Sequence, residues 1–100
     1  MHKLVVLYPY PQDEAKFRAY YESGHLPLAR KIPGLTASRH SMAVEGMGGQ
    51  SPYFCIFEAA FPDAATMAAG MGSPEGQATG ADVANFATTQ PVIIHYEVKS

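Results

Sequence analysis

Apolar and polar residues follow two different rhythms along this chain, and these rhythms predict strands and helices. Residues 3–9 form a short, almost continuous apolar run rich in valine, which is typical of a strand with both faces buried. Asp13 is then a good helix N-cap, and apolar or small residues recur every three or four positions from Phe17 to Leu28. The pattern predicts an amphipathic helix that ends at residues 32–35, where a proline is followed by a glycine.

The remainder of the chain contains three further strand-like runs and two stretches that open with helix-starting residues. The run at 53–61 is the clearest strand, because it is rich in aromatic residues and apolar at both odd and even positions. Glycines in the last helical stretch predict short, irregular turns. In order, we expect a strand at 35–46, a glycine-rich loop at 46–52, a strand at 53–61, a helix beginning at Pro62–Asp63, helical turns at 73–86 and a strand at 91–99.

The order β-α-β-β-α-β predicts an α+β, ferredoxin-like fold, in which right-handed crossovers place both helices on one face of a four-stranded antiparallel sheet. Phe61 directly precedes the second helix and should pack back on it, so Tyr53, Cys55 and Phe57, which share its parity, should face the helices. Phe54 would then lie on the opposite face. That face is also apolar and would be left in water, so we expect a second copy of the chain to cover it and form a homodimer.

Composition narrows the class of protein. The 100 residues suit a single domain over positions 1–100, and 47% apolar with 16% charged residues is ordinary for a globular protein. A net charge of −2 argues against a nucleic-acid partner, and no apolar stretch approaches the roughly 18 residues that a membrane span needs. Cys55 is the only cysteine, which excludes an internal disulfide and favours the reducing cytoplasm.

Two segments carry a resemblance to a known family: FRAYYESGHLPLARKIPGL, ending at Leu35, and SPEGQATGADVANF, ending at Phe86. With the last strand, they make the chain resemble the EthD family, named for ethyl tert-butyl ether degradation, over residues 3–98. The resemblance implies a dimeric α+β barrel of two stacked ferredoxin-like sheets, with a pocket between the helices and the sheet of each subunit. Relatives in the wider superfamily include heme-degrading and cofactor-free monooxygenases, muconolactone isomerases and polyketide cyclases, so the resemblance does not itself assign a reaction.

His25 is the main candidate for chemistry. Pro27 lacks an amide hydrogen and disfavours the α conformation for Leu26, while Gly24 loosens the preceding turn. We therefore expect a kink or short break in the helix that lets His25 reach a pocket between the helix and the sheet. A histidine titrates near neutral pH and can act as an acid or a base. The alternative is a buried histidine that only bonds a carbonyl freed by the kink.

Five other residues complete the predicted site. His40, in the middle of the second strand, is a second candidate for proton transfer, although exposed strand histidines are common. Tyr53 could donate a hydrogen bond to a carbonyl or enolate oxygen, or it could be an ordinary core tyrosine. Tyr21 and Phe57 are expected to line the substrate pocket beside His25. Cys55 should lie there too, as a small and unreactive core residue.

No motif in the sequence indicates a cofactor. The histidines and the cysteine lack the close spacing of metal ligands, and neither GxGxxG nor a P-loop is present. His25 could ligate heme iron, but the chain has no tryptophan, a residue that the heme-degrading branch uses. We therefore expect no metal and no cofactor. The favoured function is proton transfer, as in an isomerase or cyclase, on a hydrophobic oxygenated small molecule from a degradative or secondary-metabolic pathway; the alternatives are a non-catalytic binding protein and a cofactor-free monooxygenase.

Overall fold

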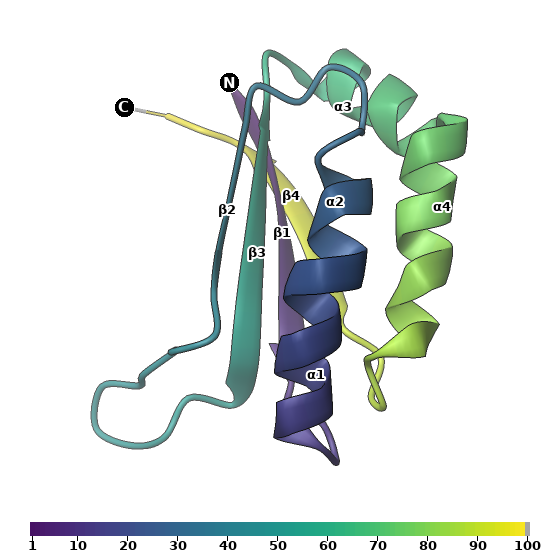
Figure 1. The fold of residues 1–100 in the computed structure, drawn as a ribbon. Helices are drawn as coiled ribbons and strands as arrows, with labels where there is room; N and C mark the ends of the chain where they lie inside the picture. The colour runs from purple at the N-terminus through teal and green to yellow at the C-terminus, as the bar shows by residue number, and fades with distance from the viewer. Residues whose placement is uncertain (100) are drawn as a thin grey trace.

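A computed structural model describes residues 1–99 of the chain. Its four strands form one antiparallel sheet in the order β2-β3-β1-β4, and all helices lie on one side of it (Figure 1). This confirms the predicted ferredoxin-like α+β fold. The elements are β1 (His2–Pro9), α1 (Glu14–Tyr20), the π-helical turn η1 (Tyr21–His25), α2 (Leu26–Ala29), β2 (Ala37–Ser41), β3 (Tyr53–Phe61), α3 (Ala64–Gly72), α4 (Pro74–Asp82), the 3-10 turn η2 (Val83–Asn85) and β4 (Val92–Glu97).

The core lies between the sheet and the helices. Alternate residues of the two central strands contribute to it, and Phe17, Tyr21 and Leu26 pack on them from the first helical segment. The helix-facing strand residues are Leu4, Val6 and Tyr8 on β1 and Cys55, Phe57, Ala59 and Phe61 on β3. The prediction from the parity of Phe61 is therefore confirmed over most of β3.

The parity argument is wrong at the start of β3. Tyr8 pairs with Cys55 but Pro9 pairs with Tyr53, so Phe54 is an extra residue in the ladder, as in a β-bulge. The bulge turns Phe54 to the helix side, where it is buried with its ring centroid 5.1 Å from that of Phe17. Our expectation that Phe54 lies on the opposite face is therefore wrong, as is the expectation that Tyr53 packs with Cys55 and Phe57 against the helices: Tyr53 pairs with Pro9 and lies outside the core cluster.

The first helix was predicted to kink or break near residues 24–26; it is irregular there, but the alternative of a break is wrong. The chain stays helical through Leu26, whose φ of −57° and ψ of −39° lie in the α region that Pro27 was expected to disfavour. Instead, the amide of Leu26 donates to the carbonyl of Tyr21, five residues earlier, and the turn widens to a π-helix. A single π turn adds one residue to the helix and accommodates Pro27, which has no amide hydrogen to donate. Such turns are frequent at functional sites.

Two element lengths differ from the prediction. Residues 73–86 form a regular helix, α4, followed by η2, because the side chain of Ser73 caps the amide of Gly76. The second strand is shorter than 35–46 and ends at Ser41, whose hydroxyl accepts from the amide of Ala43 and closes a turn.

Candidate functional site

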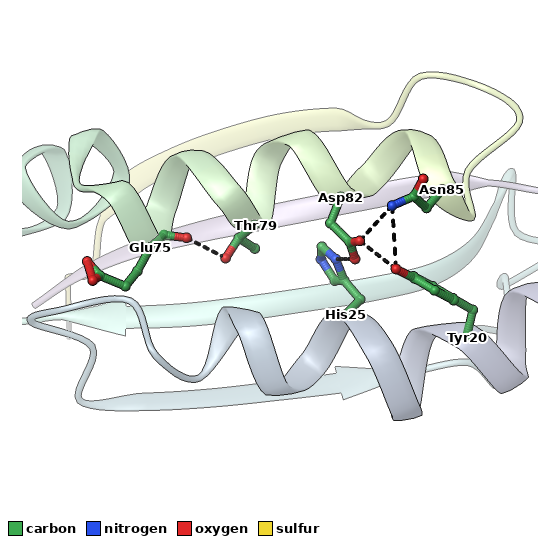
Figure 2. A network of polar contacts seen from close by, with 6 residues as sticks. All are labelled: Tyr20, His25, Glu75, Thr79, Asp82 and Asn85. Atoms are coloured by element: carbon green, nitrogen blue, oxygen red, sulfur yellow. Dashed lines mark hydrogen bonds and ion pairs between the residues drawn. The ribbon is translucent and has the colours of Figure 1, made fainter.

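His25 on η1 and Asp82 on α4 form a buried pair between the two helical segments (Figure 2). Nδ1 of His25 lies 2.9 Å from Oδ2 of Asp82, and the two side chains are 5% and 8% exposed. The other oxygen of Asp82 accepts from the hydroxyl of Tyr20 at 2.6 Å and from Nδ2 of Asn85 at 2.9 Å. Both oxygens of the carboxylate are therefore hydrogen-bonded.

The surroundings set the charge of each partner. Burial raises the pKa of Asp82, but the hydrogen bonds from Tyr20, Asn85 and His25 together outweigh it, and the net shift is downward. Burial lowers the pKa of His25 more than the neighbouring Asp82 raises it. At neutral pH, Asp82 is thus an anion and His25 a neutral imidazole. Since a carboxylate only accepts hydrogen bonds, Nδ1 carries the proton and Nε2 keeps a free lone pair.

The π turn explains how one helical segment supplies two hydrogen-bond donors to the same carboxylate. Tyr20 and His25 are five positions apart, and an ideal α-helix would point them about 140° away from each other. The wider turn at η1 changes that relation, so both side chains reach Asp82 on α4. The residue on which the sequence placed a kink is therefore held in position by a specific backbone feature.

A small cavity of about 60 Å³ lies between the helices and the sheet, and His25 is part of its wall. The lining is mostly apolar; besides His25, its members include Tyr8, Phe57, Thr79, Gly80, Val83 and Ile93. The hydroxyl of Thr79 already donates to the carbonyl of Glu75, so His25 and Tyr8 are the polar side chains of the wall that can still form hydrogen bonds with a ligand. The cavity thus resembles a small-molecule site with few polar groups.

Nε2 of His25 has no hydrogen-bond partner among residues 1–99, yet it remains accessible. Within that range, the Tyr21 hydroxyl is the one side-chain polar atom that is both fully buried and without a partner, so the unpartnered Nε2 is not fully buried. Around the imidazole, the ring of Tyr21 stacks at 5.4 Å and that of Phe86 lies at 4.6 Å. The lone pair of Nε2 therefore stays available in apolar, aromatic surroundings.

Three other predicted site residues are buried in the core, but only Phe57 belongs to the cavity wall, so the expectation that Tyr21 and Cys55 line the cavity is wrong. Tyr21 is wholly buried against His25, and burial, followed by its neighbours Cys55 and Tyr8, raises the pKa of its hydroxyl. Phe57 lines the cavity. Burial raises the pKa of the Cys55 thiol to about 12, so it remains protonated and is a poor nucleophile.

The remaining two predicted residues lie outside the cavity wall. His40 is exposed on the edge strand β2, with its ring 5.7 Å from that of Tyr21. Tyr53 is half-buried at the bulged start of β3 and lies outside the core cluster. The structure thus places His25 and Phe57 in the cavity wall and Tyr21 and Cys55 in the core; His40 lies beside the ring of Tyr21, and Tyr53 lies outside the core cluster.

Sequence reasoning missed the partners of His25, above all Asp82. One feature of the sequence could have pointed to it: Asp82 ends a helix, where the dipole disfavours a negative charge, so such a residue needs donors nearby. In the sequence, Tyr20 fits the apolar spacing of the first helix and Tyr8 lies in the apolar run at 3–9, so neither stands out as a polar site residue. Asn85 follows Asp82 by three positions, a spacing that lets the two side chains meet on one helical turn.

Residues 1–99 contain neither a cluster of metal ligands nor a membrane-spanning helix. No three His, Cys, Asp or Glu side chains gather there as a metal-ion site would require. None of the helices in that range combines the length and the hydropathy needed to cross a bilayer.

Comparison with known proteins gives a consistent picture. The EthD domain model matches residues 9–90. An uncharacterized 11.0 kDa protein from the thcB–thcC intergenic region of Rhodococcus erythropolis is 32% identical over 88 residues, which are 88% of this chain and 85% of that protein.

Solved structures show the same relationship. An ethyl tert-butyl ether degradation (EthD) family protein from Bacillus halodurans superposes with a TM-score of 0.91 at 32% identity, covering 99% of each chain. A dimeric ferredoxin-like protein of unknown function from Jannaschia sp. CCS1 has a TM-score of 0.69 at 23% identity over 97% of each chain, which shows the shared fold. The family-model match and the 32% identities show that this chain belongs to the EthD family.

Proposed function

We propose that this protein is an enzyme that moves a proton on a small, hydrophobic carbonyl compound without a bound cofactor, with His25 as the acid/base. One observation carries the proposal: a buried carboxylate holds Nδ1 of a neutral histidine at 2.9 Å, and that histidine lines an apolar cavity. A carboxylate that fixes the tautomer and orientation of an imidazole is the arrangement by which many enzymes prepare a histidine base.

The reaction follows from the polar groups in the cavity wall. Nε2 of His25 takes a proton from the carbon next to the carbonyl; the C–H electron pair forms the enolate C=C bond, and the carbonyl π electrons move to oxygen. Asp82 stabilises the imidazolium that results. Returning the proton to another atom gives an isomer. Attack of the enolate carbon on a second carbonyl carbon of the substrate gives a ring: the new C–C bond forms as that carbonyl's π electrons move to its oxygen, which takes the proton from the imidazolium. Tyr8 can donate to the enolate oxygen, because burial raises the pKa of its hydroxyl and keeps it protonated.

Hydrogen–deuterium exchange tests this function without knowledge of the natural substrate. Butanone in D₂O is incubated with the protein, and exchange of the hydrogens next to its carbonyl is followed by proton NMR. We expect catalysed exchange with the native chain and a rate about 10²- to 10⁴-fold lower for His25→Gln, the usual contribution of a general base. His95→Gln, on the exposed strand β4, is the matched control and should leave the rate unchanged.

The outcomes separate the alternatives. Absence of catalysed exchange in the native chain, together with retained binding of butanone, would favour a binding protein and contradict the proposal. An equal loss of rate in His40→Gln and none in His25→Gln would move the base to the other histidine.

The proposal includes a homodimer formed through the sheet face opposite the helices. Val92, Ile94 and Tyr96 on β4 share that face with Val5 and Leu7 of β1, and they are 42%, 46% and 44% exposed in the single chain. Exposed apolar side chains in such a row favour burial against another surface. The Jannaschia relative, described as dimeric, supports a second copy as the partner. Sedimentation should give the mass of two chains; a stable monomer at micromolar concentration would contradict it.

We further place the protein in the cytoplasm. In support, Cys55 is the only cysteine and is a free thiol in the core, which suits a reducing compartment. Fractionation of cells that express a tagged chain would test this location.

A further inference from the structure

An apolar groove of about 410 Å³ continues outward from the cavity that His25 lines. Three residues, Gly80, Val83 and Ile93, belong to the walls of both spaces, so the groove and the cavity adjoin. The groove lies beside the end of α4, η2 and the chain segment that leads into β4. In Figure 1, α4 is the green helix and β4 is the yellow strand. The groove thus borders the cavity at these three residues.

The chemistry of the groove indicates what part of a ligand it would hold. No charged side chain is part of its wall. Val83, Ala84, Ala87, Pro91 and Ile93 make the lining mostly apolar, and Thr89 and Gln90 are its polar members. Ile93 is 57% exposed, although it belongs to the helix-facing side of its strand. Apolar surface of this kind gains from contact with hydrocarbon, and the wall carries no charge that would bind an ion.

Size requires a division of the ligand between the two spaces. The cavity of about 60 Å³ takes roughly two water-sized groups, enough for a carbonyl and its neighbouring carbon but not for a larger molecule. The rest of any larger substrate must lie outside, and the groove is a mostly apolar surface that borders the cavity at Gly80, Val83 and Ile93.

From this geometry, and resting on the proposed function, we infer that the substrate is an amphiphile with a hydrocarbon tail. Its carbonyl head meets His25 in the cavity and its tail lies in the groove. The tail passes Gly80, at the junction of the two spaces, and Gly80 therefore sets the chain length that the protein accepts.

Gly80 is suited to this role because it leaves the junction open. A Cβ atom added at Gly80 would meet nothing within 4 Å, so its missing side chain corresponds to free space. Gly76, one helical turn earlier, differs: its Cβ would collide with the carbonyl oxygens of Gly70 and Met71. Gly76 is thus needed for packing between α3 and α4, whereas Gly80 can accept a larger residue without displacing the backbone.

The test uses straight-chain 2-alkanones from butanone to 2-decanone, with binding measured by calorimetry and exchange by proton NMR in D₂O. With the native chain, we expect affinity to rise about fourfold for each added methylene that enters the groove. Gly80→Leu should abolish this gain, so that 2-decanone binds no better than butanone. Gly72→Leu is the matched control, since a Cβ at Gly72 also meets nothing within 4 Å and Gly72 lines neither space.

The results separate this inference from the function on which it rests. Affinity that does not depend on chain length would overturn the tail-binding groove, even if His25-dependent exchange of butanone persists. A chain-length dependence that Gly80→Leu removes would support the groove, even if no exchange is catalysed and the proposed function fails. A change in sedimentation for Gly80→Leu, but not for Gly72→Leu, would show that a second copy of the chain occupies the groove and would overturn the inference.

Discussion

Asp82→Asn is the sharpest perturbation of the proposed dyad, because it keeps the size and shape of the side chain and changes only its donors and charge. Oδ1 of Asp82 accepts from both Tyr20 and Asn85, whereas Oδ2 meets only Nδ1 of His25. The asparagine oxygen should remain beside the donors Tyr20 and Asn85, and its NH₂ group should then face His25. Nδ1 would have to accept, and the proton of the imidazole would move to Nε2.

The size of the effect follows from this change of tautomer. A protonated Nε2 has no lone pair towards the cavity, so the full contribution of the base, about 10²- to 10⁴-fold in exchange rate, should be lost. Stability should fall less markedly. The hydrogen bonds of Asp82 are charge-assisted and become neutral ones, and the cost is partly offset because a buried charge disappears; we expect a loss of about 1–3 kcal/mol in the free energy of unfolding.

Two measurements on one variant check this reasoning. Nitrogen NMR of the imidazole should show the proton on Nδ1 in the native chain and on Nε2 in Asp82→Asn, and butanone exchange should fall in parallel. Asp63→Asn is the matched control: Asp63 caps α3 by accepting from the amide of Thr66 at 2.7 Å, and asparagine caps helices equally well. An unchanged tautomer, or an unchanged exchange rate with the altered tautomer, would refute the dyad.

Three further outcomes are expected. Burial lowers the pKa of His25 in the folded chain, so the free energy of unfolding should decline as the pH falls from the pKa of the unfolded chain, about 6.5, through the lower pKa of the folded chain. His25→Gln should reduce this dependence on pH in denaturant titrations. Gly76→Ala should cost about 1–3 kcal/mol through collision, whereas Gly80→Ala should gain about 0.5–1 kcal/mol, and thermal melts that rank them alike would contradict the assigned packing. Ile94→Lys should shift the sedimenting species towards a single chain without unfolding it, as circular dichroism would show.

The fold was predictable because it depends on patterns that repeat along the chain. The continuous apolar run of β3 and the three-to-four spacing of the first helix each extend over many residues, so one irregular position does not change the assignment. The errors lie where a single residue decides. One extra residue at Phe54 reverses the side on which its ring lies, and the Ser41 turn ends β2 early. Neither feature alters hydrophobic periodicity enough to be detected from it.

For a similar reason, the sequence predicted His25 but not its partner Asp82. His25 stood out because glycine and proline flank it in an otherwise helical stretch. Asp82 is 57 positions away in sequence, and its partnership with His25 depends on how two helices are rotated against each other on the sheet. No periodicity encodes that rotation, and an aspartate on a helix is most often a solvated surface residue.

Two local features supply the rotation that brings the pair together. The π turn at η1 changes the direction of His25 relative to Tyr20, so that one carboxylate can receive both. On the other side, Gly76 lets α4 begin close against the carbonyls of Gly70 and Met71, and Asp82 lies less than two turns further along. A side chain at Gly76 would push the start of α4 outward and carry Asp82 with it. The chemistry proposed for His25 therefore depends on a glycine that touches neither the cavity nor the imidazole, and Gly76→Ala should slow butanone exchange beyond what its loss of stability alone explains.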